Sequence, residues 1–402
     1  MRILLLSLLI ITSKAKAASE CENFNTPNDV LKCVVENHAA VQVGRAQVSE
    51  VSLGIDVATQ RPNPQFDFEG TDQIGEGFTS EVAILHTFEL GGKRSARMKV
   101  AEREKDLSQT DLLSNQEQVS IQTVTDLYRL RQINKELEIV EEIISTFQKI
   151  TAQYSKAGKL SPEDNMSVSV FSMALEENKL KRNSLINERQ GIFARIQGAI
   201  NKKIEITDKV LPTFKSEWPT LKSTVIGGSQ IKKAKTELEL SNATYGLEKA
   251  QSWPNLSIGP KVEIENSGRS ETRYGLALSI PLPLYQANGG GRAKSLAGVR
   301  RSELNLQYTK SRLERQNEYL HEVYSRVSQG IGKALSNKQI GLKHQDLHKM
   351  INRGVISAPI VIELHRQIMD YYEKLHEQEL DGVTALWQIA ALEGRILKEE
   401  LK

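Results

Sequence analysis

The chain has 402 residues, of which 39% are hydrophobic, 26% charged and only 5% aromatic. So few aromatic residues argue against a β-sandwich or a large α/β core, and long stretches without glycine or proline predict long helices. The first 17 residues carry three of the 53 basic side chains and no acid, so the remaining chain, with 50 acids, is neutral. A neutral chain lacks the basic face that nucleic-acid binding needs, and no nucleic-acid partner is expected.

The N-terminus has the three parts of a secretory signal peptide. Met1-Arg2 is followed by the apolar run Ile3 to Ile11 and then by Ala15-Lys16-Ala17, which predicts a leader over residues 1–17. A buried N-terminal strand or anchor is the alternative interpretation. No other apolar run approaches the roughly 18 residues of a transmembrane helix, so the exported chain is expected to enter a membrane only through β-strands.

Two cysteines, Cys21 and Cys33, follow this leader. An even pair in an exported protein predicts a disulfide that closes a short loop. Free or transient thiols remain an alternative, and so does lipidation of Cys21. A lipid anchor, however, needs a small residue before the cysteine, and Glu20 stands there.

One pattern occurs twice along the chain, offset by about 190 to 198 residues. Each copy contains a strand hairpin, a long helix, a tight turn and a second long helix, preceded by a helical segment such as 28–59. The first repeat covers 18–200, with a hairpin at 64–90 and helices at 93–155 and 162–200. The second covers 229–402, with a hairpin at 254–285 and helices at 289–352 and 358–400, and an irregular link at 201–228 joins the two repeats.

The expected strands alternate between apolar and polar residues. Phe66 and Phe68 alternate with Asp67 and Glu69 in the first hairpin. The second hairpin has the longest alternation, formed by Tyr274, Leu276, Leu278, Ile280, Leu282 and Leu284. A period of two gives each strand one apolar and one polar face.

The segment 93–155 contains neither proline nor glycine and predicts one helix of about 95 Å. Apolar residues recur in it at steps of four and three, the spacing of a coiled-coil seam. They are Ile133, Leu137, Val140, Ile144, Phe147 and, further on, Tyr154. A kinked series of shorter helices is the alternative.

Both long helices end in a similar phrase, Gly158-Lys159-Leu160-Ser161 and Gly354-Val355-Ile356-Ser357. Glycine allows the left-handed residue that ends a helix, and serine caps the next helix. The phrases therefore predict two tight turns at the tips of helical hairpins.

Four strands of about ten residues match the length that crosses an outer membrane obliquely. An open four-stranded sheet leaves its edge groups without hydrogen-bond partners in lipid, and membrane barrels begin at eight strands. Three copies would close a barrel of twelve strands around a polar lumen. An ordinary soluble two-hairpin domain on a coiled coil is the alternative.

With the duplication and the paired tip turns, two further phrases carry a resemblance to a known family. Phe88 to Arg94 and Ser279 to Tyr285 are similar to the corresponding segments of TolC-type outer-membrane efflux proteins. The similarity is greatest to the heavy-metal (cobalt-zinc-cadmium) branch of the resistance-nodulation-division (RND) efflux systems. It covers essentially the whole mature chain.

The resemblance implies a mainly α-helical protein with membrane β-structure: a homotrimer with a 12-stranded β-barrel in outer membrane lipid and an α-helical tunnel across the periplasm. It also implies a passive conduit fed by a periplasmic adaptor protein and an inner-membrane RND pump, with heavy-metal cations as the candidate cargo. The adaptor would dock at the tips, at Gly158, Ser161, Gly354 and Ser357. The alternatives are an exit duct for type I protein secretion and a pore-free periplasmic coiled-coil scaffold.

The resemblance also implies an acidic gate near the tips. Glu363 lies nine residues after the second tip glycine, where the family has an acid. Six residues after that glycine the family also has an acid, but this chain has Ile360, and Asp164 holds the equivalent place in the first repeat. A solvated, outward-facing Glu363 is an equally good interpretation.

Other chemistry is weakly indicated. The chain has no nucleophile elbow, phosphate loop or zinc-protease motif, so neither an enzyme nor a cofactor is expected. His344 and His348 lie four apart on a helix, and His365 is expected at a similar height on the partner helix. These three are weak candidates for a divalent metal site, although surface histidines are commonly just solvated.

Overall fold

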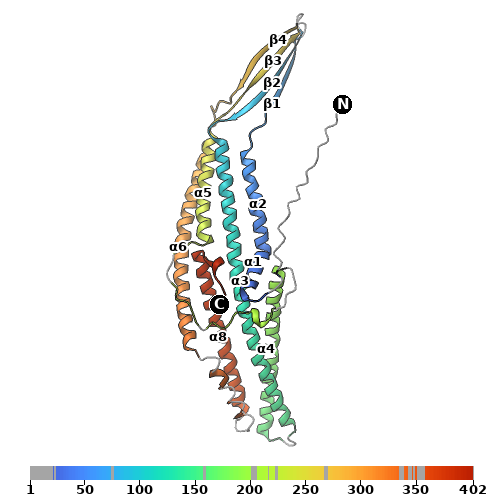
Figure 1. The fold of residues 1–402 in the computed structure, drawn as a ribbon, viewed down its shortest axis with the longest axis vertical. Helices are drawn as coiled ribbons and strands as arrows, with labels where there is room; N and C mark the ends of the chain where they lie inside the picture. Colours follow the sequence, from blue (N-terminus) through green and yellow to red (C-terminus); the bar gives the residue numbers. More distant parts are fainter. Residues whose placement is uncertain are drawn as a thin grey trace, which may run out of the picture.

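The computed structural model describes residues 21, 24–73, 77–156, 160–200, 206–215, 217–221, 225–266, 270–334, 339–342, 346, 349–350 and 358–401. The expected leader, residues 1–17, lies outside the described residues. The molecule is elongated, with a sheet at one end and long helices below it (Figure 1).

Two helices, α1 (Pro27–Asn37) and α2 (Ala39–Thr59), replace the single helical segment expected at 28–59. They are separated by His38, whose backbone is extended (φ −56°, ψ 133°). The His38 ring also accepts a hydrogen bond from the N–H of Ala40 at 3.1 Å and so caps α2. A local side-chain cap of this kind offers the backbone an alternative to continuing the helix.

The sheet consists of β1 (Gln65–Gln73), β2 (Gly77–Glu89), β3 (Asn255–Asn266) and β4 (Ser270–Ser279). All neighbours are antiparallel, in the order β1-β2-β3-β4. The two hairpins of the duplication therefore join through β2 and β3. The fourth strand ends at Ser279 although the alternation continues to Leu284, because Pro281 and Pro283 have no N–H for a ladder.

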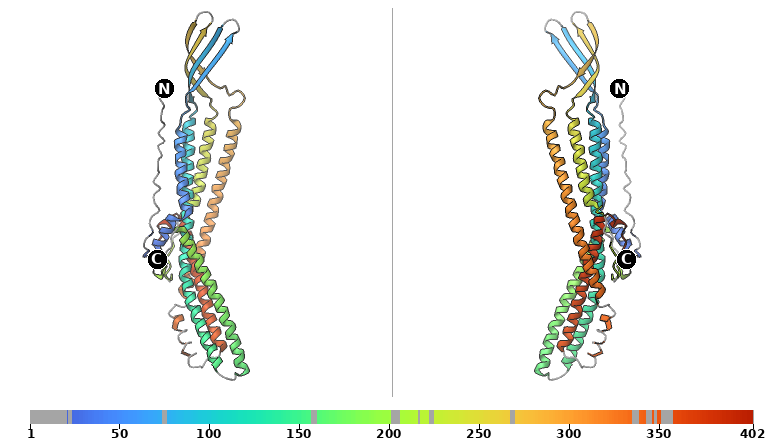
Figure 2. Two further views of the ribbon diagram at one scale, coloured as in Figure 1. Left: turned by 90° about the vertical axis from the view of Figure 1, so that its right-hand side faces the viewer. Right: turned by 90° about the vertical axis from the view of Figure 1, so that its left-hand side faces the viewer.

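The long helices are α3 (Lys93–Lys156), α4 (Pro162–Ile200), α5 (Ser229–Ala250), α6 (Gly289–Lys333) and α8 (Ala358–Glu393). As predicted, α3 is uninterrupted over its 64 residues. In the half of the molecule next to the sheet, α2, α3, α5 and α6 lie side by side. In the half farther from the sheet, α3 is flanked by α4 and α8 (Figures 1 and 2).

Two helices are shorter than the sequence predicts. The helix expected at 289–352 ends at Lys333, where Ala334 is extended (ψ 156°); Gly330 and Gly332 weaken its last turn. The helix expected at 358–400 ends at Glu393, because Gly394 is left-handed (φ 76°). The next residue, Arg395, donates its N–H to Ala390 O at 2.9 Å, which completes a glycine C-cap. Short 3₁₀ turns lie at Asp208–Val210 and Ile396–Lys398.

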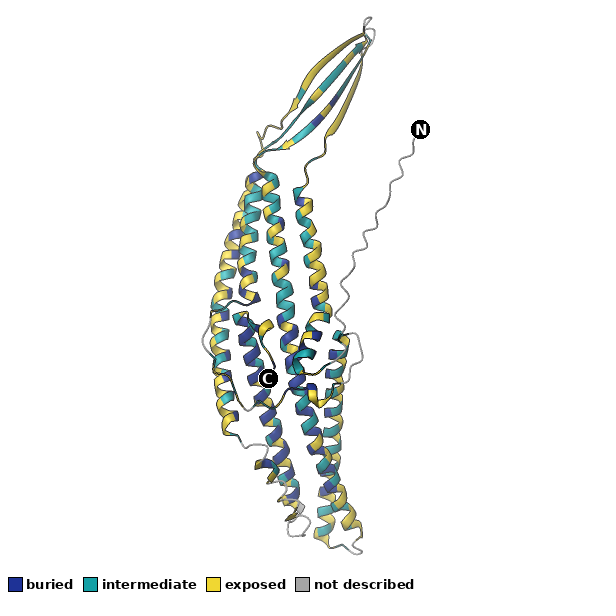
Figure 3. Ribbon diagram, in the orientation of Figure 1, coloured by how far each residue is buried: buried dark blue, intermediate teal, exposed yellow. Residues whose placement is uncertain are grey.

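Burial is concentrated in the middle and lower parts of the helical region, whereas the sheet is largely exposed (Figure 3). The seam predicted in α3 is confirmed, since Ile133, Val140 and Phe147 are fully buried and Tyr154 is half-buried. Over the described ranges, no helix combines the length and the apolar character needed to cross a membrane.

Candidate functional site

The two faces of the sheet differ completely in chemistry. The strand register places even-numbered residues on one face and odd-numbered residues on the other. The even face is apolar and exposed: Tyr274 is 82% and Leu276 78% accessible. Its other large exposed members are Phe66, Phe68, Phe78, Ile84, Phe88, Ile264 and Leu278. A contiguous apolar face of this size marks a surface that contacts lipid or protein.

The odd-numbered face carries charges, with acids in excess. Its acids are Asp67, Glu69, Glu81, Glu89, Glu263, Glu265 and Glu271, and its bases are Lys261 and Arg273. The register places Glu69 opposite Glu81, and Glu81 opposite Glu263. Lys261 Nζ lies 2.5 Å from Glu81 Oε2, and Arg273 Nη2 lies 2.9 Å from Glu265 Oε2. Like charges directly opposite one another weaken a sheet, so folding alone does not account for this row.

Both edges of the sheet are unpaired in the described chain. Among the described strands, β1 and β4 each have a neighbour on one side only. Beneath them α2 and α6 stand at the two edges of the helical layer (Figure 2). Each carries exposed apolar residues, among them Val57 on α2 and Tyr308 on α6. Unpaired strand edges are templates for pairing with another chain.

The junction between the sheet and the helices is built from the segment 90–94, which follows β2 and contains two glycines and two basic residues. Gly91 is left-handed (φ 73°), and a Cβ there would lie 2.5 Å from the indole of Trp253. Arg94 donates from Nε to Thr59 O at 2.7 Å. This segment therefore holds α3 against the ends of α2 and α5, which explains why it combines glycine with a basic residue.

A buried ion network joins three helices near the middle of the molecule. Glu136 on α3, only 1% exposed, accepts from Arg129 Nη1 at 2.8 Å and pairs with His376 Nδ1 of α8 at 2.7 Å. Arg129 also donates from Nε to Glu188 of α4 at 2.7 Å. Burial by itself would raise the pKa of Glu136, but the hydrogen bonds from His376 and Arg129 outweigh it and lower that pKa.

A second buried carboxylate, Glu379, lies on α8 one turn after His376. Glu379 is completely buried and forms an ion pair with Arg131. It also accepts from Gln132 Nε2 at 2.9 Å and from the backbone N–H of Lys215 in the link at 2.8 Å. The two networks connect α3, α4, α8 and the link 201–228 at one level, between the two halves of the helical region.

The tip of the first repeat has the expected cap. Ser161 and Asp164 form a capping box: the N–H of Asp164 donates to Ser161 Oγ at 3.1 Å, and the N–H of Ser161 donates to Asp164 Oδ2 at 3.3 Å. The carboxylate of the gate candidate Asp164 is thus engaged in starting α4. The other tip residues, Gly158, Gly354 and Ser357, lie outside the described residues.

The second gate candidate, Glu363, is exposed in the second turn of α8. It accepts from Arg366 Nη2 at 2.7 Å and from Gln367 Nε2 at 2.8 Å. The hydrogen bonds from Gln367 and Arg366 lower the pKa of Glu363, so it is a carboxylate at neutral pH. Both gate candidates lie near the helix ends farthest from the sheet (Figure 1).

The structure places His365, the third histidine of the metal-site hypothesis, in the core. This side chain is 1% exposed, its Nδ1 lies 2.7 Å from Val361 O, and its ring packs edge-on to Phe147. His344 and His348 lie outside the described residues, and the part of the chain that is described holds no group of three potential metal ligands.

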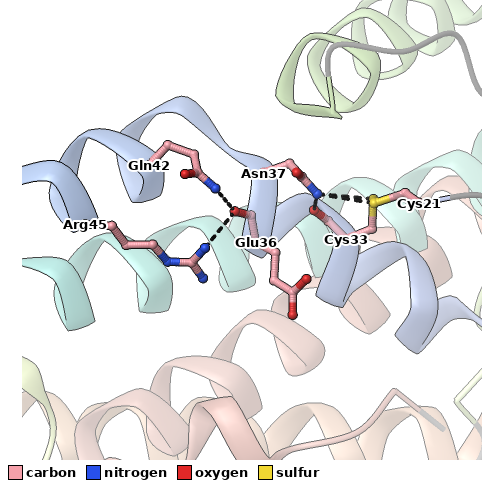
Figure 4. Close-up of a disulfide and its surroundings, with 6 residues drawn as sticks. All are labelled: Cys21, Cys33, Glu36, Asn37, Gln42 and Arg45. Atoms are coloured by element: carbon pink, nitrogen blue, oxygen red, sulfur yellow. Dashed lines mark hydrogen bonds between the residues drawn. A yellow bond between two sulfur atoms is a disulfide. The ribbon is translucent and has the colours of Figure 1, made fainter. Parts of the chain in front are cut away.

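Cys21 and Cys33 form a disulfide (Figure 4). Asn37 donates from Nδ2 to Cys21 Sγ at 3.2 Å and to Cys33 O at 2.9 Å, which fixes the bridge against the end of α1. Nearby, Asn28 binds the backbone of Leu401 through both its amide atoms, at 2.8 and 3.1 Å. The two ends of the described chain are therefore anchored at the same level.

Sequence reasoning missed the buried ion networks. The available indication was helical spacing alone: Arg129, Gln132 and Glu136 recur on one side of α3. Their partners His376 and Glu379 are at least 240 residues further along the chain, and charges in a coiled-coil pattern are usually solvated.

One curated relative is a heavy-metal resistance protein. The Cobalt-zinc-cadmium resistance protein CzcC of Cupriavidus metallidurans is 27% identical to this chain over 244 residues. The match covers 59% of this chain and 58% of that protein, so it spans less than two thirds of the relative's length. No family model matches the chain.

Solved structures agree over nearly the whole length. CusC, described for folding and transmembrane channel formation, superposes with a TM-score of 0.70 at 12% identity, covering 92% of each chain. The MtrE outer membrane channel of Neisseria gonorrhoeae gives 0.68 at 12% identity, over 92% of this chain and 90% of that one. The Campylobacter jejuni CmeC outer membrane channel gives 0.67 at 12% identity, over 93% and 87%.

Proposed function

We propose that this chain, which has the fold of TolC-type outer-membrane channels, is the outer-membrane component of a tripartite efflux system. The observation that carries the proposal is the sheet, which has an exposed apolar face, a charged face and two unpaired edges. Such a sheet resembles a segment of a barrel wall. The helical layer beneath it, also open at both edges, is the matching segment of a tunnel wall.

Closure requires more than one copy. Four strands fall short of the eight that the smallest membrane barrels contain, whereas three copies supply twelve. In that homotrimer the apolar face contacts outer membrane lipid and the acidic face lines the lumen. The long helices extend into the periplasm as an α-helical tunnel.

The chain works as a passive conduit and not as an enzyme. A periplasmic adaptor protein docks at the ends of the helical hairpins, through the sequence segments that contain Gly158 and Ser161 in the first repeat and Gly354 and Ser357 in the second. An inner-membrane RND pump drives the transport. The acid excess on the lumenal face and the similarity to a cobalt-zinc-cadmium resistance protein favour heavy-metal cations as cargo.

Native mass measurement of detergent-extracted protein tests the assembly. We expect a trimer that dissociates to monomers on heating. The unheated protein should form conducting pores in planar bilayers, and the heated protein should not. A detergent-stable monomer with full strand content would contradict the proposal. Deleting the gene should sensitise cells to cobalt, zinc or cadmium and leave tolerance of uncharged toxic compounds unchanged; the reverse pattern would exclude the metal cargo.

A further inference from the structure

The loop between β4 and α6 exposes a run of large apolar side chains. Leu282, Leu284 and Tyr285 are 69%, 77% and 102% accessible, and Ile280 is also exposed. This run contacts neither the sheet nor the helices closely enough to be buried, and it projects to one side of the molecule (Figure 2). Leaving so much apolar surface in water is unfavourable, so the run is expected to be covered.

The loop is held at both ends and stiff in between. At one end Ser279 pairs with Ser257 of β3. At the other, Asn288 donates from Nδ2 to Glu248 Oε2 of α5 at 2.6 Å. Pro281 and Pro283 restrict the backbone between these points. A preorganised apolar loop loses little entropy on binding, which is typical of a docking element.

The opposite edge of the molecule offers a complementary surface at the same height. The last turns of α2 expose Leu53 and Val57, which lie four residues apart and so share one face. The helix α2 ends just below β1, as the loop lies just below β4 (Figures 1 and 2). Loop and α2 thus stand at the two open edges of the same wall.

We infer that the loop 280–285 of one copy packs onto Leu53 and Val57 of α2 in the next copy. The inference rests on the proposed trimer, because joining the β4 edge of one copy to the β1 edge of its neighbour brings these two surfaces together. The contact is heterologous, with the loop on one side and the helix on the other, and it closes a ring. It would seal the joint where barrel and tunnel meet.

Cysteine cross-linking of the full-length protein in outer membranes tests the contact. In Tyr285→Cys combined with Val57→Cys, a short bis-maleimide should link neighbouring copies into dimers and trimers on denaturing gels. The native cysteines are bridged to each other and do not react. The matched control is Tyr285→Cys with Val43→Cys, because Val43 is equally exposed on α2 but about 21 Å lower; it should give no more product than either single variant.

Native mass measurement on the same samples separates the two proposals. A trimer with cross-links specific to Val57 supports the contact. A trimer without them overturns the contact, leaves the proposed function intact, and assigns the loop to lipid. Absence of any trimer in the parent protein overturns both. A second variant, Leu282→Ser with Leu284→Ser, should lower the temperature at which the trimer dissociates without changing the monomer's helix content.

Discussion

At the scale of single residues, the most informative feature is the carboxylate of Glu136, which is buried and bound by both Arg129 and His376. An ion pair in such a place contributes little net stability, because desolvation offsets the Coulombic attraction. Removing one partner, however, leaves an uncompensated buried charge. The network of Arg129, Glu136 and His376 therefore fixes how α3 and α8 cross more than it strengthens the fold.

We predict that Glu136→Gln lowers the free energy of unfolding by about 3 kcal/mol at pH 7.5, because Arg129 then lacks its buried counterion. Urea unfolding followed by circular dichroism measures this loss. Glu188→Gln is the control, since Glu188 is an exposed partner of the same arginine and should cost less than about 1 kcal/mol. Equal losses in both variants would contradict the special role of the buried carboxylate.

The pH dependence of this effect has a defined sign. The pKa of Glu136 is lower in the folded chain than its ordinary value of 4.5. Its stabilising contribution is therefore fully present above pH 4.5 and is lost as the pH falls through the folded pKa. The difference in the free energy of unfolding between the parent and Glu136→Gln should therefore shrink as the pH falls below 4.5.

The gate candidate Glu363 predicts a change in ion selectivity. If three copies of this carboxylate surround the periplasmic mouth, Glu363→Gln should reduce cation preference and block by divalent ions in planar bilayers. Glu377→Gln is the matched control, because Glu377 lies two heptads further along α8 and forms a similar pair with Lys374. Unchanged selectivity in Glu363→Gln would indicate that Glu363 is a solvated surface residue outside the gate, and Asp164 would be the next candidate.

At the scale of elements, the structure depends on where helices are allowed to stop. Extended residues at His38 and Ala334 end α1 and α6, and the left-handed Gly394 ends α8. Between the sheet and α3, the left-handed Gly91 and the indole of Trp253 occupy one small space. The short segment between β2 and α3 thus couples the direction of the first hairpin to the direction of α3, a helix of 64 residues.

Gly91→Ala is expected to disturb this coupling. A left-handed alanine costs about 1–2 kcal/mol, and its Cβ would also overlap Trp253. The fraction of trimer seen on gels without heating should fall. Gly54→Ala is the control, because a Cβ at Gly54 in α2 meets no atom within 4 Å and alanine favours the helix; it should leave the trimer intact. A normal trimer in Gly91→Ala would show that the junction tolerates rearrangement.

At the scale of the whole molecule, charge is distributed to suit a lumen. The helices carry mixed charges at their surfaces, whereas the odd-numbered sheet face concentrates acids and the other face is apolar. In a closed trimer this acidic face repeats three times around a water-filled space. A field of one sign then raises the local concentration of cations along the exit path.

Replacing Glu69, Glu81 and Glu263 together by glutamine should lower the cation-to-anion permeability ratio of the pore. Arg273→Gln should raise it, which controls for effects of substitution as such. Both changes should weaken from 0.1 M to 1 M salt, because the Debye length falls from about 10 Å to about 3 Å. Reversal potentials in planar bilayers measure the ratio. Changes in the same direction for both variants would contradict lumenal placement of this face.

Local patterns in the sequence were sufficient for most of the architecture. The alternation of Tyr274, Leu276 and Leu278 determines a two-faced strand, and the absence of breakers in 93–155 determines an unbroken helix, because both properties depend on near neighbours only. The capping box of Ser161 and Asp164 is equally local. The spacing of Cys21 and Cys33 predicted their bridge as a short loop closure.

What only the tertiary structure decided concerns contacts between distant segments. The pairing of β2 with β3 unites hairpins about 170 residues apart and creates the row of Glu81 and Glu263. The burial of His365 against Phe147, and of Glu136 against His376, depends on how α3 and α8 cross. Periodicity along one helix shows which residues share a face, but not which partner covers that face. For this reason a histidine expected at the surface lies in the core, and acids expected to be solvated hold the middle of the molecule together.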